Sequence, residues 1–172
     1  NPATEELIPY CEIIEVGALK VDPRTLTVLD TFDCKAAMAH PDRMEPMARK
    51  VNGYNEKDWE NAPTLRQALA LYNSWAENGI FWGDTPSFDF TLLEIAWSTF
   101  GMEHPVHRKP RSVQDYVNGI LVAKGYPEIP GSFGGEMAKF FGVAEPTVHR
   151  AINGARQAYE VYLAARNLLL EE

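Results

Sequence analysis

The spacing of hydrophobic positions changes along the chain and separates a strand region from a helical region. Residues 11–22 are rich in β-branched apolar side chains, which favour strand over helix. Residues 26–36 alternate apolar and polar positions, as a half-buried strand does. Between them, residues 22–25 place Pro after Asp, a pattern typical of a turn. The two segments therefore predict an antiparallel hairpin.

Helical spacing follows the hairpin. In residues 64–79, Leu65, Leu69 and Tyr72 recur at helical intervals, after a threonine suited to an N-cap. Further helices are predicted over residues 44–53, 87–101, 112–125, 136–142 and 147–170. Residues 80–84 predict a short buried strand. Helices packed on a mixed sheet indicate an α/β domain, although three short strands leave such a sheet incomplete.

Composition narrows the class of protein. The 172 residues are 45% hydrophobic and 23% charged, which suits one globular domain with a core. The net charge of −8 argues against nucleic-acid binding through a broad basic face, but not against a local site where metal ions meet phosphate. Cys11 and Cys34 have no metal-site spacing and favour a reduced, cytoplasmic protein. No membrane span or secretory signal is expected.

Asp89 is the first candidate for chemistry. It follows the strand of residues 80–84, and open α/β sheets place ligand sites beyond the carboxyl ends of their strands. A carboxylate in the first turn of a helix is also favourable without any catalytic role. Trp82 and Phe88 flank this loop and stay open as side chains that stack on bases, whereas most other aromatic residues fit core positions.

His149 is predicted in the first turn of the last helix, where the helix dipole favours a neutral imidazole that can act as a general base. An ordinary surface histidine would give the same pattern. Gly154 interrupts this helix at a cost of about 1 kcal/mol relative to Ala, which close helix packing would explain. Basic runs at residues 48–50 and 107–111 favour a solvated face over phosphate contacts. Three further histidines fit no metal motif and are expected to be structural or solvated: His40, His104 and His107.

Over nearly the whole chain, these segments resemble the DnaQ-like (DEDDh) 3′–5′ exonucleases of the ribonuclease-H-like fold. "CEIIEVGALKVD" (11–22) resembles the second strand of that family. "MEPMARKVNGYNEKDW" (44–59) resembles its helix ending in an Asn/His-Gly turn. "FWGDTPSFDFTLLE" (81–94) resembles its second motif and "HRAINGARQAYEVY" (149–162) its third. The Trp-Gly pair before "FD" is most similar to small phage and bacterial stand-alone members.

The resemblance implies two-metal hydrolysis of phosphodiesters at the 3′ end of single-stranded DNA or RNA. In that family, four carboxylates hold two Mg²⁺ or Mn²⁺ ions and a histidine deprotonates the attacking water. At the matching positions, Asp89 would be a metal ligand and His149 the base, with Trp82 and Phe88 beside the substrate. Relatives are often dimers, so a homodimer stays open, and no membrane partner is implied.

The sequence departs from the family pattern twice. No Asp-x-Glu strand is present, and residues 1–15 resemble the loop that follows it. We therefore expect one domain, residues 1–172, that is N-terminally incomplete and whose missing first strand would pair beside residues 11–22. Glu5 and Glu6 lie in that loop and are poor substitutes. Gly154 stands where the family has its last metal-ligand Asp.

Three of four carboxylate ligands are thus missing, which predicts weak Mg²⁺ binding and little or no nuclease activity. The alternative is a catalytically dead pseudo-nuclease that serves as a nucleic-acid or protein binding module. A third reading is an unrelated α/β interaction module, in which the order of the motifs would be coincidence. The sequence does not decide between DNA and RNA.

Overall fold

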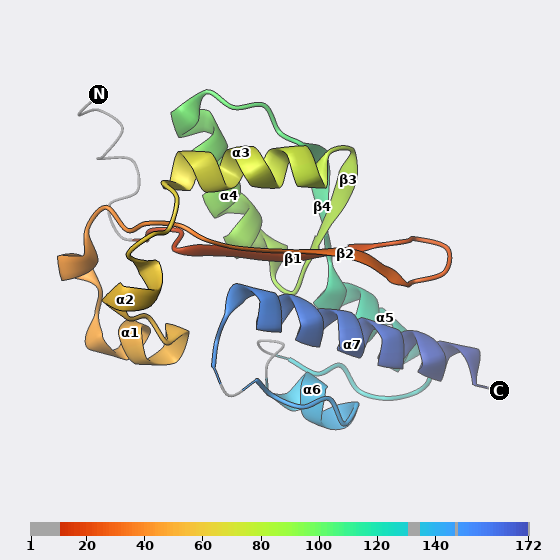
Figure 1. The fold of residues 1–172 in the computed structure, drawn as a ribbon. Coiled ribbons are helices and arrows are strands. Elements are labelled where there is room, and N and C mark those ends of the chain that lie inside the picture. The colour runs from red at the N-terminus through yellow and green to blue at the C-terminus, as the bar shows by residue number, and fades with distance from the viewer. Residues whose placement is uncertain (1–10, 131–134, 147, 172) are drawn as a thin grey trace.

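A computed structural model describes residues 11–130, 135–146 and 148–171, and its helices lie on both sides of the strands (Figure 1). The strands are β1 (Glu15–Val21), β2 (Val28–Lys35), β3 (Gly79–Gly83) and β4 (Val106–Ser112). The helices are the short 3-10 helix η2 (Pro41–Arg43), α1 (Pro46–Asn52), α2 (Glu56–Trp59), α3 (Leu65–Ala76), α4 (Pro86–Phe100), α5 (Val113–Ala123), α6 (Glu136–Phe140) and α7 (Ala151–Leu170). The predicted mixed α/β fold is confirmed.

The strands form two separate pairs. β1 and β2 are antiparallel, with Glu15 opposite Lys35, which confirms the predicted hairpin. β3 and β4 are parallel, with Gly79 opposite Val106. Among the described residues, no strand pairing joins the hairpin to the parallel pair. The hairpin crosses the parallel pair in Figure 1, with α3 and α4 on one side of it and α5, α6 and α7 on the other.

Strand β4 corrects one expectation from the sequence. The basic run at residues 107–111, together with His107, was expected in a solvated loop, yet it forms most of a strand. Arg, Lys and Pro disfavour a central strand, but an edge strand tolerates them because one side needs no ladder hydrogen bonds. The described strands leave β4 at the edge of its pair, which accounts for Pro110. The domain therefore has at least four strands rather than three.

Local capping explains where the helices begin and end. Thr64 and Gln67 form a capping box at the start of α3. Ser112 Oγ accepts a hydrogen bond from the Asp115 backbone N–H at 3.0 Å and starts α5. Gly101 ends α4 in the left-handed conformation, with φ of 63°. α3 ends earlier than expected, because Asn78 takes the left-handed conformation and leaves Gly79 to begin β3.

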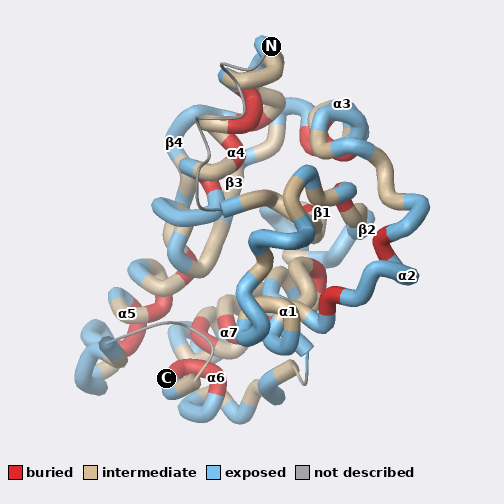
Figure 2. The backbone as a smooth tube through the Cα atoms, turned by 90° about the vertical axis from the view of Figure 1, so that its left-hand side faces the viewer, coloured by how far each residue is buried: buried red, intermediate tan, exposed pale blue. Residues whose placement is uncertain are grey.

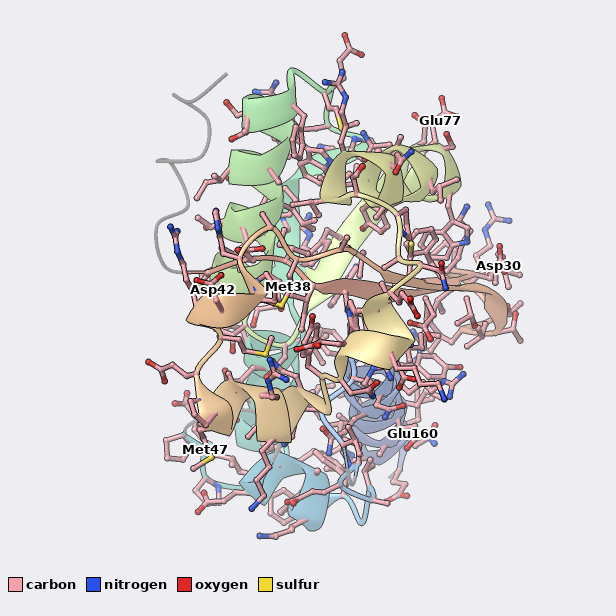
Figure 3. The ribbon with its side chains drawn as sticks, turned by 60° about the vertical axis from the view of Figure 1, so that its left-hand side comes forward. Asp30, Met38, Asp42, Met47, Glu77 and Glu160 are labelled. Carbon is pink, nitrogen blue, oxygen red and sulfur yellow. The ribbon has the colours of Figure 1, made fainter. Side chains whose placement is uncertain are left out.

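Two hydrophobic cores lie on opposite sides of the strands, and Figure 2 shows the buried backbone concentrated in the helices. The first core joins α3 and α4 to β1 and centres on Trp97, whose Nε1–H donates to Asn73 Oδ1 at 2.9 Å. The second core joins α5, α6 and α7 around Val117, Leu121 and Val161. Within the described part of the chain, no helix is both long and apolar enough to cross a membrane.

Candidate functional site

The carboxyl ends of β3 and β4 place Asp89 where the sequence predicted it. β3 ends at Gly83 and the chain turns directly into α4, whose first turn carries Asp89. The turn is tight, because a Cβ on Gly83 would lie 3.0 Å from the Phe81 ring. Ser112 Oγ donates a hydrogen bond to the Asp84 carbonyl oxygen at 3.4 Å and ties this turn to the start of α5. The end of the parallel pair is thus a fixed edge of the fold.

Trp82 and Phe88 both present aromatic surface beside this edge. The Trp82 side chain is 44% exposed and that of Phe88 is 59% exposed. Trp82 is held by edge-to-face contacts with Tyr116 of α5 and Tyr162 of α7, at centroid distances of 5.9 and 5.5 Å. The exposed part of Trp82 is therefore presented at a fixed angle, which suits stacking on a base.

Asp89 is exposed as a whole residue, yet the protein atoms around its carboxylate desolvate the charge and raise the pKa of this group above its usual value. No hydrogen bond or ion pair joins Asp89 to His149 within the described chain. Among the described residues, no group of three or more His, Cys, Asp and Glu side chains is placed to hold a metal ion. Two Mg²⁺ ions need several carboxylates, so these residues do not fit a two-metal centre. Glu5 and Glu6 lie outside the described residues.

His149 is not in the first turn of α7, and that expectation is wrong. The helix begins at Ala151 with Arg150 as its extended N-cap, so His149 precedes the helix by two residues. Its backbone N–H donates to the Val51 carbonyl at the end of α1, at 3.2 Å. The neighbouring Val148 is close enough to Gly53 that a Cβ on this glycine would lie 2.8 Å from Val148 Cγ1. The segment that carries His149 is therefore held in place by contacts with α1. His149 lies outside the first helical turn, where the helix dipole would act on its imidazole.

The start of α7 is fixed by a half-buried ion pair that sequence reasoning missed. The guanidinium of Arg150 donates to Glu15 of β1 through Nε, at 2.9 Å to each carboxylate oxygen. The Glu15 carboxylate also accepts from the Ala151 backbone N–H at 3.1 Å. Burial raises the pKa of Glu15, but the Arg150 hydrogen bonds and charge and the Ala151 N–H outweigh it, so the pKa is lowered overall. Glu15 and Arg150 are 135 positions apart, a separation that no local pattern reports.

Around this pair, Trp59 of α2 joins three segments. Its Nε1–H donates to the Ile14 carbonyl oxygen at 2.9 Å. The Arg150 guanidinium lies 5.1 Å and the Lys35 ammonium 4.6 Å from its ring centre. Trp59 of α2 thus links β1 and β2 to the residue that begins α7, which gives this side chain a structural role.

Gly154 lies on the exposed side of α7, and the explanation by close packing is wrong. A Cβ at this position would meet nothing within 4 Å. The glycine that permits close approach is Gly17 of β1, where a Cβ would lie 2.7 Å from Ile152 Cα. The conformational cost of Gly154 in a helix is therefore not offset by any contact of its own.

Comparison with known proteins matches most of the chain to one family. Residues 4–162 match the family model RNase_T, described as exonuclease. The PolC-type DNA polymerase III of Caldanaerobacter subterraneus subsp. tengcongensis is 22% identical over 162 residues. That match covers 93% of this chain but 11% of the polymerase, so the chain spans about a ninth of the length of this relative.

Solved structures share the fold at low identity. The nuclease domain of 3′hExo, a DEDDh family member bound to rAMP, has a TM-score of 0.72 at 16% identity, covering 91% of this chain and 80% of that one. A 3′-exonuclease that recognises the histone mRNA stem-loop has a TM-score of 0.71 at 14% identity, covering 92% and 56%. Cell-death related nuclease 4 (CRN-4) has a TM-score of 0.72 at 13% identity, covering 93% and 57%.

Proposed function

The chain belongs to the RNase_T family of exonucleases, and on that premise we propose that it binds the 3′ end of a single-stranded nucleic acid beside Trp82, Phe88 and Asp89. The carboxyl edge of β3 and β4 supports this proposal, because ligands of open α/β sheets bind there. The exposed and angularly fixed Trp82 supports it as well. Two proteins of similar fold are described with rAMP and with the 3′ end of a histone mRNA stem-loop, which favours the same class of ligand here.

We further propose that this chain hydrolyses its ligand weakly or not at all. The observation that carries this proposal is Gly154, which offers no side-chain donor where the resembled third motif has an Asp. Asp89 alone supplies one carboxylate from the matching positions within the described residues. His149 would then be a base without a metal-bound water to act on. The second candidate function is that of a binding module without catalysis. It differs from an impaired enzyme because restoring the missing metal ligands would not recover hydrolysis.

A nuclease assay tests impaired hydrolysis. The chain, Gly154→Asp and the double variant Gly154→Asp, Asp89→Asn are incubated with Mg²⁺ or Mn²⁺ and 5′-labelled 20-nucleotide oligothymidylate or oligouridylate. We expect little digestion by the unaltered chain. Robust metal-dependent digestion by it would contradict the proposal. Digestion gained in Gly154→Asp and lost in the double variant favours an inactivated enzyme. Because Gly154→Asp restores only one of the three missing ligands, the binding module is favoured only if a chain that also carries an N-terminal Asp-x-Glu strand stays inactive with both metals.

A binding assay tests the proposed ligand. Fluorescence anisotropy in EDTA compares the linear oligonucleotide with a circular single strand of the same composition as competitor. Trp82→Ala is expected to weaken binding by about 5- to 150-fold, because stacking on one base contributes about 1–3 kcal/mol. Tyr126→Ala is the matched control, since Tyr126 is also 44% exposed but lies in the loop after α5. Equal affinity for linear and circular strands, or equal losses in both variants, would refute 3′-end binding at Trp82.

A further inference from the structure

Strand β4 contains a bulge that brings three cations close together along the strand, and the last of them, Arg111, lies opposite Trp82. Ile80 of β3 pairs with His107 of β4, and Trp82 pairs with Arg111. Two steps along β3 therefore lie opposite four steps along β4. At about 3.3 Å per residue, this compresses Arg108, Lys109 and Arg111 into roughly 7 Å of strand axis. Such bulges are frequent next to functional sites, where they redirect side chains.

These cations are available for a ligand. Arg108, Lys109 and Arg111 are exposed. Within the described chain, no ion pair joins any of the three to a carboxylate: the ion pairs involve Arg49, Lys139 and Arg150. The cations extend from Arg108, which lines a shallow depression of about 450 Å³ with Glu103 beside the end of α4, to Arg111 beside Trp82.

The positive charge of Arg108, Lys109 and Arg111 indicates which kind of ligand this strand binds. A chain with net charge −8 repels a polyanion at long range, so contact with nucleic acid requires a local concentration of cations. Guanidinium and ammonium groups are the usual partners of backbone phosphates, and such contacts position a strand without reading its sequence. Arg111 adjoins Trp82, so a strand whose terminal base stacks on Trp82 brings its phosphates towards β4.

We propose that the β4 bulge binds the backbone phosphates of the single strand whose 3′ end lies beside Trp82. The inference rests on the proposed function, because it extends the same site along the strand. Arg108, Lys109 and Arg111 contact successive phosphates and supply most of the salt-sensitive part of the affinity. Sequence and sugar type do not enter these contacts, so DNA and RNA are held alike by this surface.

Salt dependence of binding measures these contacts. Affinity of the 20-nucleotide strands is followed by anisotropy in EDTA between 50 and 200 mM NaCl, for the unaltered chain and for Arg108→Gln, Lys109→Gln, Arg111→Gln combined. Each phosphate contact to a single strand contributes about 0.7 to the slope of log affinity against log salt. Loss of three contacts should flatten the slope by about 2, so that the variant loses roughly 20-fold less affinity than the unaltered chain across this range.

A matched variant separates the surface from net charge. Arg24→Gln, Lys57→Gln and Arg66→Gln combined remove the same charge from three exposed sites on other elements. The slope should be nearly unchanged in this control, and circular dichroism checks that both variants fold. The inference would be overturned if the salt slope flattened equally in both variants. It would also be overturned if the slope did not flatten in the β4 variant, and these cations would then serve only to keep the exposed strand edge from pairing. Failure of the unaltered chain to bind either strand would instead refute the proposed function and the inference together.

Discussion

Replacing Gly154 by Ala is expected to stabilise the folded chain, by an amount that follows from its place in α7. Gly154 is the fourth residue of a helix of 20 residues, and a Cβ there meets nothing within 4 Å. Alanine adds no clash and reduces the conformational entropy of the unfolded chain. The expected gain is about 0.8–1.0 kcal/mol in the free energy of unfolding. For a chain of this size, that gain corresponds to a rise in Tm of about 2–4 °C.

Urea unfolding followed by far-UV circular dichroism measures this change. Gly119→Ala is the matched control, because Gly119 also lies inside a helix, α5, with no atom within 4 Å of a Cβ. Both variants should gain a similar stability. A neutral or destabilising Gly154→Ala beside a stabilising Gly119→Ala would refute the reasoning, since it would show that Gly154 has a packing or conformational role that its open surroundings do not reveal.

Two further predictions concern the contact between β1 and α7. Gly17→Ala should lower stability by about 3 kcal/mol, because its Cβ would overlap the Ile152 backbone, and the same urea experiment would contradict this if the loss were below 1 kcal/mol. Glu15→Gln should cost about 1–3 kcal/mol at pH 7, because the half-buried Arg150 loses its charged partner. Since folding lowers the pKa of Glu15 from its usual 4.5, the difference from the unaltered chain should be complete above pH 4.5 and vanish as pH falls through the lowered pKa; a pH-independent difference between pH 3 and 7 would exclude this origin.

Much of the fold could be predicted because its determinants are local. The hairpin follows from β-branched residues around an Asp-Pro turn, and α3 follows from a capping box between Thr64 and Gln67. Gly53 and Gly101 end their helices in the left-handed conformation that glycine adopts readily. Asp89 in the first turn of α4 was predicted for the same reason, from a strand, a turn and an apolar helix that are adjacent in sequence.

The remainder depended on contacts between distant segments. β4 has the composition of a loop and becomes a strand only because β3 pairs with one of its sides. The predicted helical start near residue 147 ignored Glu15, whose carboxylate accepts the Ala151 N–H and fixes the beginning of α7. The sequence suggested close packing at Gly154, whereas the close contact is at Gly17, because only the structure shows which glycine faces a neighbouring backbone.

The ion pair between Glu15 and Arg150 joins two segments that the ribosome synthesises at different times. β1 leaves the ribosome before α7, because Arg150 follows Glu15 by 135 residues. At a translation rate of about 5–20 residues per second, this separation corresponds to roughly 7–27 s. During that time, the Glu15 carboxylate and the face of β1 around Gly17 have no contact with α7. This side of the domain therefore stays incomplete until α7 has been translated, and nascent chains that stall before α7 expose a strand that chaperones and proteases can recognise.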